Sequence, residues 1–158
     1  MKPVEVLGVR VESPTNHPIV LLRELDGDRC VPIWIGAAEA TAIAYAQQGI
    51  EPPRPLTHDL LKNVIEGLGR TVVGVRIVAL NEGVFHAEIA FDGGTVVESR
   101  TSDAIALALR VGCPVTIAEE IIDEAGVAME PEAEDEVEKF KEFLDQVSAD
   151  DFGTDTAP

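Results

Sequence analysis

Side chains able to bind phosphate and move protons lie close together in the stretch PPRPLTHDLL (52–61). Arg54 stands among prolines, and His58 and Asp59 come just ahead of an apolar run. An arginine on a stiff arm beside a helix start could clamp a phosphate, and histidine titrates near neutral pH. A plainer interpretation is also open, in which Thr57 caps the helix and Asp59 faces the positive end of its dipole.

Two further helix starts carry similar residues. Glu39 follows the bend of WIGAAEA, and RTSDAIALALR places Ser102 and Asp103 at a helix start with Arg100 just before it. These carboxylates could equally be dipole-complementing residues, with Arg100 and Asp103 forming a structural ion pair and Ser102 or Thr101 acting as the cap.

The three carboxylates form a site only if the three helix starts converge. In that case Glu39, Asp59 and Asp103 would hold a divalent cation, Mg²⁺ or Mn²⁺, and Arg54 and Arg100 would bind a phosphodiester. The sequence alone leaves this convergence open.

The order of apolar patterns predicts the elements that position these residues. Period-two stretches alternate with alanine-rich or amphipathic ones, which favours an α+β fold with a mixed, largely antiparallel sheet of about six to seven strands and roughly three to four helices. The helix over 103–112 is apolar all round and should be deeply buried. The predicted strands are 4–11, 19–25, 30–36, 71–80, 84–92, 95–100 and 114–118, and the predicted helices are 37–49, 56–69, 103–112 and 119–126.

Acidity is concentrated at the end of the chain. The 158 residues carry a net charge of −17. Residues 1–118 hold 14 acidic and 10 basic side chains, a net of −4, whereas residues 119–158 hold 15 and 2, a net of −13. A nearly balanced body with an acidic tail does not exclude nucleic acid as a partner.

Cysteine use and hydropathy bear on location. Cys30 and Cys113 have no zinc-like spacing and are expected to be buried thiols in a reducing compartment. The N-terminus lacks the apolar region of a signal peptide, and no stretch reaches the ~18 apolar residues of a membrane span. We therefore expect a cytoplasmic protein with no membrane partner.

The C-terminal quarter is expected to be an appendage. We predict one domain over 1–126 and, over 127–158, an acidic linker, an amphipathic helix and a disordered tail. The helix would either fold back on the body or bind a protein partner through residues 132–147. Its apolar stripe comprises Val137, Phe140, Leu144 and Val147, with Phe143 beside it.

Four stretches together resemble a known family. VPIWIGAAEATAIA, PPRPLTHDLL, VFHAEI and RTSDAIALALR occur in the order and spacing of the bifunctional nuclease domain family, over roughly residues 3–125. The tail looks like that of actinobacterial members. The resemblance implies cleavage of both DNA and RNA. The chain departs from the family at Thr101, where a proline is usual, and keeps its charged positions at Glu39, Arg54, His58, Asp59, Arg100, Ser102 and Asp103.

Two functions are consistent with these residues. The first is metal-assisted phosphodiester hydrolysis, in which Arg54, Arg100 and Ser102 bind substrate and His58 moves a proton. Nucleic-acid affinity should then be weak and fall steeply with salt, because basic and aromatic residues are few. The second is a non-catalytic oligomeric module whose acidic tail helix recruits a protein. Under either hypothesis we expect a homo-oligomer, with Trp34 as a core or interface anchor.

Overall fold

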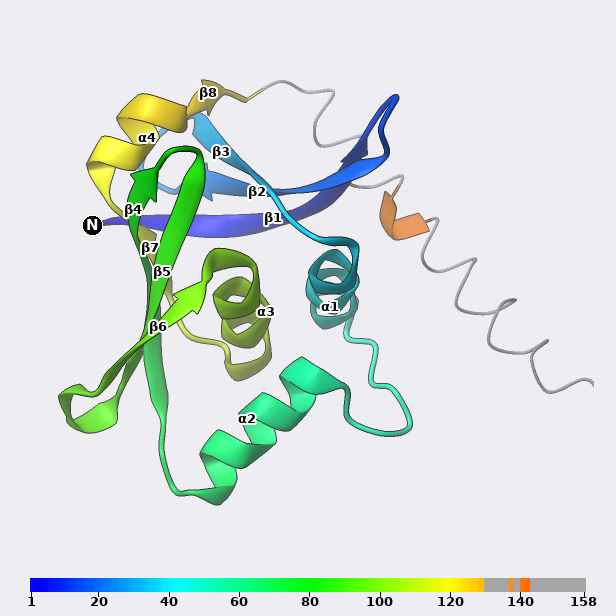
Figure 1. The fold of residues 1–158 in the computed structure, drawn as a ribbon, viewed down its shortest axis with the longest axis vertical. Helices are drawn as coiled ribbons and strands as arrows, with labels where there is room; N and C mark the ends of the chain where they lie inside the picture. The colour runs from blue at the N-terminus through cyan, green and yellow to red at the C-terminus, as the bar shows by residue number, and fades with distance from the viewer. Residues whose placement is uncertain (130–136, 138–139, 143–158) are drawn as a thin grey trace, which may run out of the picture.

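The computed structural model describes residues 1–129, 137 and 140–142. They form an eight-stranded sheet with helices packed against it (Figure 1). The strands are β1 (Lys2–Glu12), β2 (His17–Glu24), β3 (Arg29–Trp34), β4 (Val72–Asn81), β5 (Val84–Phe91), β6 (Val96–Arg100), β7 (Val115–Ile117) and β8 (Val127–Ala128). The helices are α1 (Ala37–Gln48), α2 (Thr57–Gly67), α3 (Thr101–Val111) and α4 (Glu119–Ala125), and a 3-10 turn at Asp92–Gly94 joins β5 to β6.

The sheet order confirms the predicted α+β class. The strands run β6-β5-β4-β7-β1-β2-β3-β8, and every pair is antiparallel except β4 with β7. The sheet has more strands than predicted, because β8 is a two-residue strand on the edge of β3, too short to show any periodicity. It also lies just beyond the expected domain boundary at residue 126.

Helix α3 occupies the centre of the molecule. Figure 1 shows α1 and α3 side by side within the curve of the sheet, and α3 contacts β4 and β5 as well as α1. Ile105 and Leu107 are fully buried at 0% exposure, as predicted for a helix that is apolar all round. Because α3 is buried along its length, its first and last turns are held in fixed positions against α1 and α2.

Helix α2 presents a face of mixed polarity to the body. It packs against α3 but has no buried residue, and its face toward the body carries His58, Asp59, Lys62 and Ile65, all half-buried. Polar contacts therefore contribute much of the docking of α2. Its exposed apolar residues are Leu60, Leu61, Val64 and Leu68.

The predicted helix caps are wrong in detail. Thr57 is the first residue of α2, and Leu56 occupies the capping position without a side-chain bond. Asp59 instead accepts a hydrogen bond from the Leu56 backbone N–H, at 3.0 Å from Oδ2. Arg100 occupies the capping position of α3, again with no side-chain bond, so neither Thr101 nor Ser102 acts as the cap.

Part of the C-terminal segment packs on the body. Val137 is 4% exposed and lies with Ile19, Leu21 and Cys30. A β-carbon at Gly8 would lie 2.6 Å from Val137 Cγ1, so only glycine admits this approach. Phe140 packs against the main core. These contacts favour the fold-back interpretation for the start of the predicted tail helix; Phe143, Leu144 and Val147 fall outside the described residues.

Trp34 is not a core residue. It is 54% exposed at the end of β3, and its ring meets that of His17 edge-on, with centroids 5.0 Å apart. Within the described part of the chain, no helix combines the length and apolar character needed to cross a bilayer.

Candidate functional site

Arg100 joins two of the three carboxylates singled out in the sequence. Its Nη2 lies 2.7 Å from Glu39 Oε1, and its Nε lies 2.8 Å from Asp103 Oδ2. The arginine side chain is 69% exposed, whereas that of Glu39 is 12% exposed. The hydrogen bond with Asp103, the charge of that carboxylate and the charge of Glu39 all raise the pKa of Arg100. A permanent positive charge therefore lies at the surface, held from beneath by two anions.

His58 bonds to the other oxygen of Asp103. His58 Nε2 lies 2.8 Å from Asp103 Oδ1, which links the start of α2 to the start of α3. Burial raises the pKa of Asp103, but the hydrogen bonds from His58 and Arg100 outweigh it and hold the pKa below its ordinary value. An ionised carboxylate only accepts hydrogen bonds, so Nε2 carries the hydrogen. The other ring nitrogen, Nδ1, has no partner among the described residues.

Asp59 points to a different partner. Its Oδ1 lies 2.7 Å from Nε of Arg110, whose side chain is only 7% exposed and whose Nη1 donates to the Ala106 carbonyl at 2.9 Å. Burial raises the pKa of Asp59, but the hydrogen bonds from Arg110 and the Leu56 N–H lower it by more. The pKa is therefore below its ordinary value. The consecutive residues His58 and Asp59 thus fix α2 at two points along α3.

Arg54 and Ser102 lie outside these ion pairs. Arg54 is exposed on the proline-rich loop and makes no bond to a described residue. Ser102 is 9% exposed in the first turn of α3. Beside it, the Oγ1 of Thr101 is buried with no partner among the described residues. Arg54 is therefore free to meet a ligand, whereas the Ser102 side chain is largely covered.

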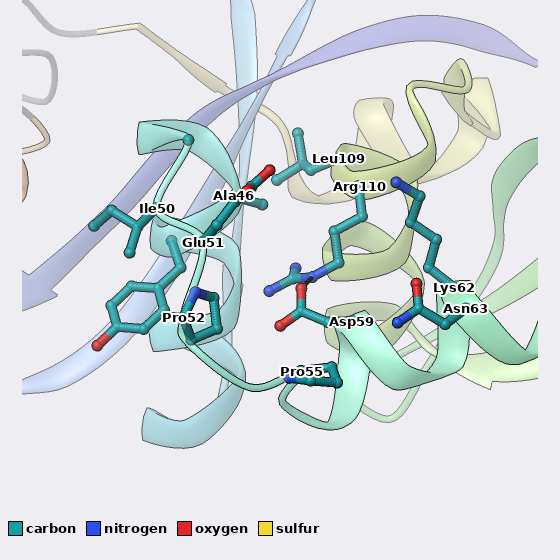
Figure 2. A pocket seen from close by; sticks show the side chains of 12 residues that line it. Ala46, Ile50, Glu51, Pro52, Pro55, Asp59, Lys62, Asn63, Leu109 and Arg110 are labelled. Carbon is teal, nitrogen blue, oxygen red and sulfur yellow. Dashed lines mark hydrogen bonds and ion pairs between the residues drawn. The ribbon is translucent and has the colours of Figure 1, made fainter.

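A pocket of about 440 Å³ opens beside the Asp59–Arg110 pair (Figure 2). It lies between the end of α1, the loop that follows it, α2 and the end of α3. Figure 2 shows Arg110 and Asp59 reaching toward the loop that carries Pro52 and Pro55. We call this cavity the proline-loop pocket. Its lining residues are Tyr45, Ala46, Gly49, Ile50, Glu51, Pro52, Pro55, Asp59, Lys62, Asn63, Leu109 and Arg110.

The predicted metal ligands do not form a set. Among the described residues, no group of three or more His, Cys, Asp or Glu side chains could hold a metal ion. Glu39 and Asp103 share Arg100, and Asp59 is bonded to Arg110. A guanidinium group thus already occupies one oxygen of each of these carboxylates, and its positive charge would oppose a divalent cation. In this arrangement the residues do not fit a resident Mg²⁺ or Mn²⁺, and the metal remains a proposal.

Residues 20–130 match the family model described as the bifunctional nuclease domain. The chain belongs to the bifunctional nuclease domain family. The chain is also 53% identical over 161 residues to proteins named as uncharacterized in two Mycobacterium tuberculosis strains, CDC 1551 / Oshkosh and H37Rv, covering 96% of this chain and 98% of each of them. It is 29% identical over 118 residues to bifunctional nuclease 1 of Oryza sativa subsp. indica, covering 71% of this chain but 35% of the rice protein.

The fold thus brings together four of the seven predicted site residues. Glu39, His58, Arg100 and Asp103 form one bonded chain across the starts of α1, α2 and α3. The role of Arg110 was not predicted from the sequence. Its position did indicate one, because Arg110 follows Asp103 by seven residues and therefore lies on the same side of α3, two turns further on.

Proposed function

We propose that the chain hydrolyses phosphodiester bonds in DNA and RNA at the cluster of His58, Arg100 and Asp103. The observation that carries the proposal is the 2.8 Å bond between His58 Nε2 and Asp103 Oδ1, beside an arginine whose side chain is 69% exposed. A histidine oriented by a carboxylate is a recurrent general base, and an exposed arginine fits a phosphate.

His58 would carry out both proton transfers, and Asp103 would orient and stabilise it. With Nε2 donating to Asp103, Nδ1 would take a proton from water as the water oxygen bonds to phosphorus. The protonated ring would return a proton to the leaving oxygen as the old phosphorus–oxygen bond breaks. Asp103 would stabilise the imidazolium that forms between these steps.

Arg100 and Arg54 would stabilise the charge that develops on the phosphate. Arg100 keeps only part of its guanidinium in bonds to Glu39 and Asp103, and Arg54 is exposed with no described partner. Few other exposed cations lie near, so binding should be weak and salt-sensitive. Mg²⁺ or Mn²⁺, if bound, would polarise the phosphate and acidify a bound water.

A pair of matched histidine variants tests the proposal. Wild type, His58→Gln and His86→Gln are assayed on single-stranded DNA and RNA, with Mg²⁺, with Mn²⁺ and with EDTA. His86 is a suitable control because its ring lies 3.9 Å from Glu98 and, within the described part of the chain, makes no side-chain bond to His58, Arg100 or Asp103, although its backbone is paired with that of Arg100. We expect cleavage by wild type and His86→Gln and its loss in His58→Gln. Equal cleavage by all three proteins, or by none, would refute the assignment, and the EDTA arm decides the metal question.

A second function, as an oligomeric binding module, is favoured by the outer face of α2. Leu60, Val64 and Leu68 are 53%, 47% and 75% exposed and are spaced four residues apart on one stripe. We propose that a second copy of the chain covers this stripe. The stripe is symmetric about Val64, so a two-fold axis there would bring Leu60 of one copy to Leu68 of the other.

A protein partner for residues 132–147 and a cytoplasmic location are also part of the proposal. A protein partner for residues 132–147 would have to compete with contacts that Val137 and Phe140 already make with the body. A cytoplasmic location is supported by Cys30 and Cys113, which are both free thiols.

A further inference from the structure

The proline-loop pocket lies outside the proposed acid–base cluster and has no assigned role. Its volume of about 440 Å³ falls within the roughly 300–1,000 Å³ typical of small-molecule sites. It shares the start of α2 with the cluster, since Asp59 lines the pocket and its neighbour His58 bonds to Asp103. Arg110 and Asp103 are seven residues apart on α3, which places them roughly 10 Å apart along the helix axis.

The pocket lining combines ring and aliphatic surfaces with charged side chains. Tyr45, Ile50, Pro52 and Pro55 supply apolar and ring surfaces, and the prolines restrict the loop. The basic residues Arg110 and Lys62 are matched by the acids Asp59 and Glu51. This balance disfavours a bare phosphate inside the pocket.

Hydrogen-bonding groups line the same space. Arg110 is fixed through Nε and Nη1, and its Nη2 has no partner among the described residues. The Asn63 amide is exposed and also unpartnered there, and the Glu51 carboxylate adds an acceptor. Donors and acceptors beside ring surfaces are what the edge and faces of a nucleobase require.

Cations on the rim would place the sugar–phosphate backbone outside. Lys62 reaches the pocket from α2 and is only loosely paired with Glu66, at 3.9 Å. Arg54 belongs to the same loop as Pro52 and Pro55 and is exposed. A base in the slot with its phosphate toward these side chains would leave the next phosphodiester directed along α3 toward His58.

We infer that the proline-loop pocket binds the base of one nucleotide of a single-stranded substrate, next to the bond that is cut. This inference rests on the proposed nuclease function and names its substrate class as single-stranded nucleic acid, held by one base. The pocket then acts as a positioning subsite and takes no part in bond breaking.

Binding of 5′-mononucleotides tests the inference without any cleavage. GMP, AMP, CMP and UMP are titrated by calorimetry into the full chain as wild type, Tyr45→Leu, Asn63→Ala and Asn81→Ala. Loss of the Tyr45 ring should weaken binding roughly 5- to 150-fold. Asn63→Ala should weaken it several-fold, whereas Asn81→Ala, on the exposed end of β4, should bind like wild type. Asn63 has no described partner, so its removal should leave folding unchanged.

A competition arm separates a strand subsite from a site for free nucleotides. A single-stranded oligonucleotide should displace the bound mononucleotide from wild type. Absence of displacement, absence of any mononucleotide binding, or equal binding by all four proteins would overturn the inference. Cleavage without mononucleotide binding would refute the subsite and leave the proposed nuclease function intact. Binding without cleavage would refute the nuclease function, and with it the position of the base beside a cut bond, and would leave only a nucleotide-binding pocket.

Discussion

Asp103 Oδ1 lies 2.8 Å from His58 Nε2, and Asp103 Oδ2 lies 2.8 Å from Arg100 Nε. One carboxylate therefore orients both a candidate base and a candidate phosphate-binding group. Asp103 is in the first turn of the buried helix α3, so the side chains of His58 and Arg100 are both held against a rigid element. Precise placement of such groups is what proton transfer and charge stabilisation require.

Replacing Asp103 with asparagine should impair cleavage more than folding. An amide can present its NH₂ to His58 Nε2 and so favour the tautomer with the proton on Nδ1, which is then unable to act as base. We expect the single-turnover rate to fall by about 10²–10⁴-fold. Asp92→Asn, at the start of the 3-10 turn and paired with Arg70, is the control. Wild-type rates in Asp103→Asn would remove the oriented histidine from the mechanism.

The Asp59–Arg110 pair should matter chiefly for stability. Arg110 is 7% exposed, so removing its partner leaves a buried charge unpaired. We expect Asp59→Ala to lower the free energy of unfolding by about 3 kcal/mol, measured by urea denaturation. Glu88→Ala breaks the more exposed pair with Arg76 and should cost under about 1 kcal/mol. Similar losses in the two variants would show that this pair is no stronger than a surface one.

Asp59 should also make stability depend on acid pH. Its folded-state pKa is below the ordinary value of about 3.9, so the unfolded chain takes up the proton first. The stabilisation is complete above that pH and is lost as the pH falls through the lower folded-state pKa. The difference in unfolding free energy between wild type and Asp59→Asn should therefore stay constant from about pH 7 to 5 and shrink below about 4. A difference that persists at pH 2.5 would contradict this account.

Local signals in the sequence were enough for most of the fold. Asn81-Glu82-Gly83 predicts a hairpin, and Glu82 and Gly83 do adopt positive φ angles of 51° and 79° between β4 and β5. The burial of α3 follows from its apolar surface on all sides. In each case the information lies within a dozen or so residues, which is the range over which periodicity and turn chemistry act.

The site depends on contacts that local patterns do not encode. Asp59 is bonded to Arg110, which lies 51 residues further along the chain, whereas the sequence patterns suggested a metal site for Asp59. The stripe of Leu60, Val64 and Leu68 has the spacing of a core-facing helix, yet it faces outward. An amphipathic pattern states that a face will be covered, but it does not say by what. The approach of the first turns of α1, α2 and α3 depends on how the helices pack together, and the sequence of a single segment does not encode it.

Arg100 should compete with divalent cations for Glu39 and Asp103. Its guanidinium occupies one oxygen of each carboxylate. Arg100→Met removes that competitor, so we expect Mn²⁺ to bind this variant at least several-fold more tightly than wild type in calorimetric titrations. Arg76→Met, which frees only Glu88, should not gain affinity. Tight Mn²⁺ binding by wild type that Arg100→Met leaves unchanged would mean that the metal binds elsewhere.

A charge on the outer stripe of α2 should dissociate the proposed homo-oligomer. In the double variant Val64→Glu with Leu60→Glu, the carboxylate at position 64 would face its own symmetry mate, and the one at position 60 would face Leu68 of the other copy. The first pair would repel, and both carboxylates would lose hydration. Light scattering after size exclusion should give a mass above the 16.9 kDa of one chain for wild type and close to it for the variant. Val84→Glu, in an equally exposed position on β5, should leave the wild-type mass unchanged. A wild-type mass equal to that of one chain would refute the proposed homo-oligomer.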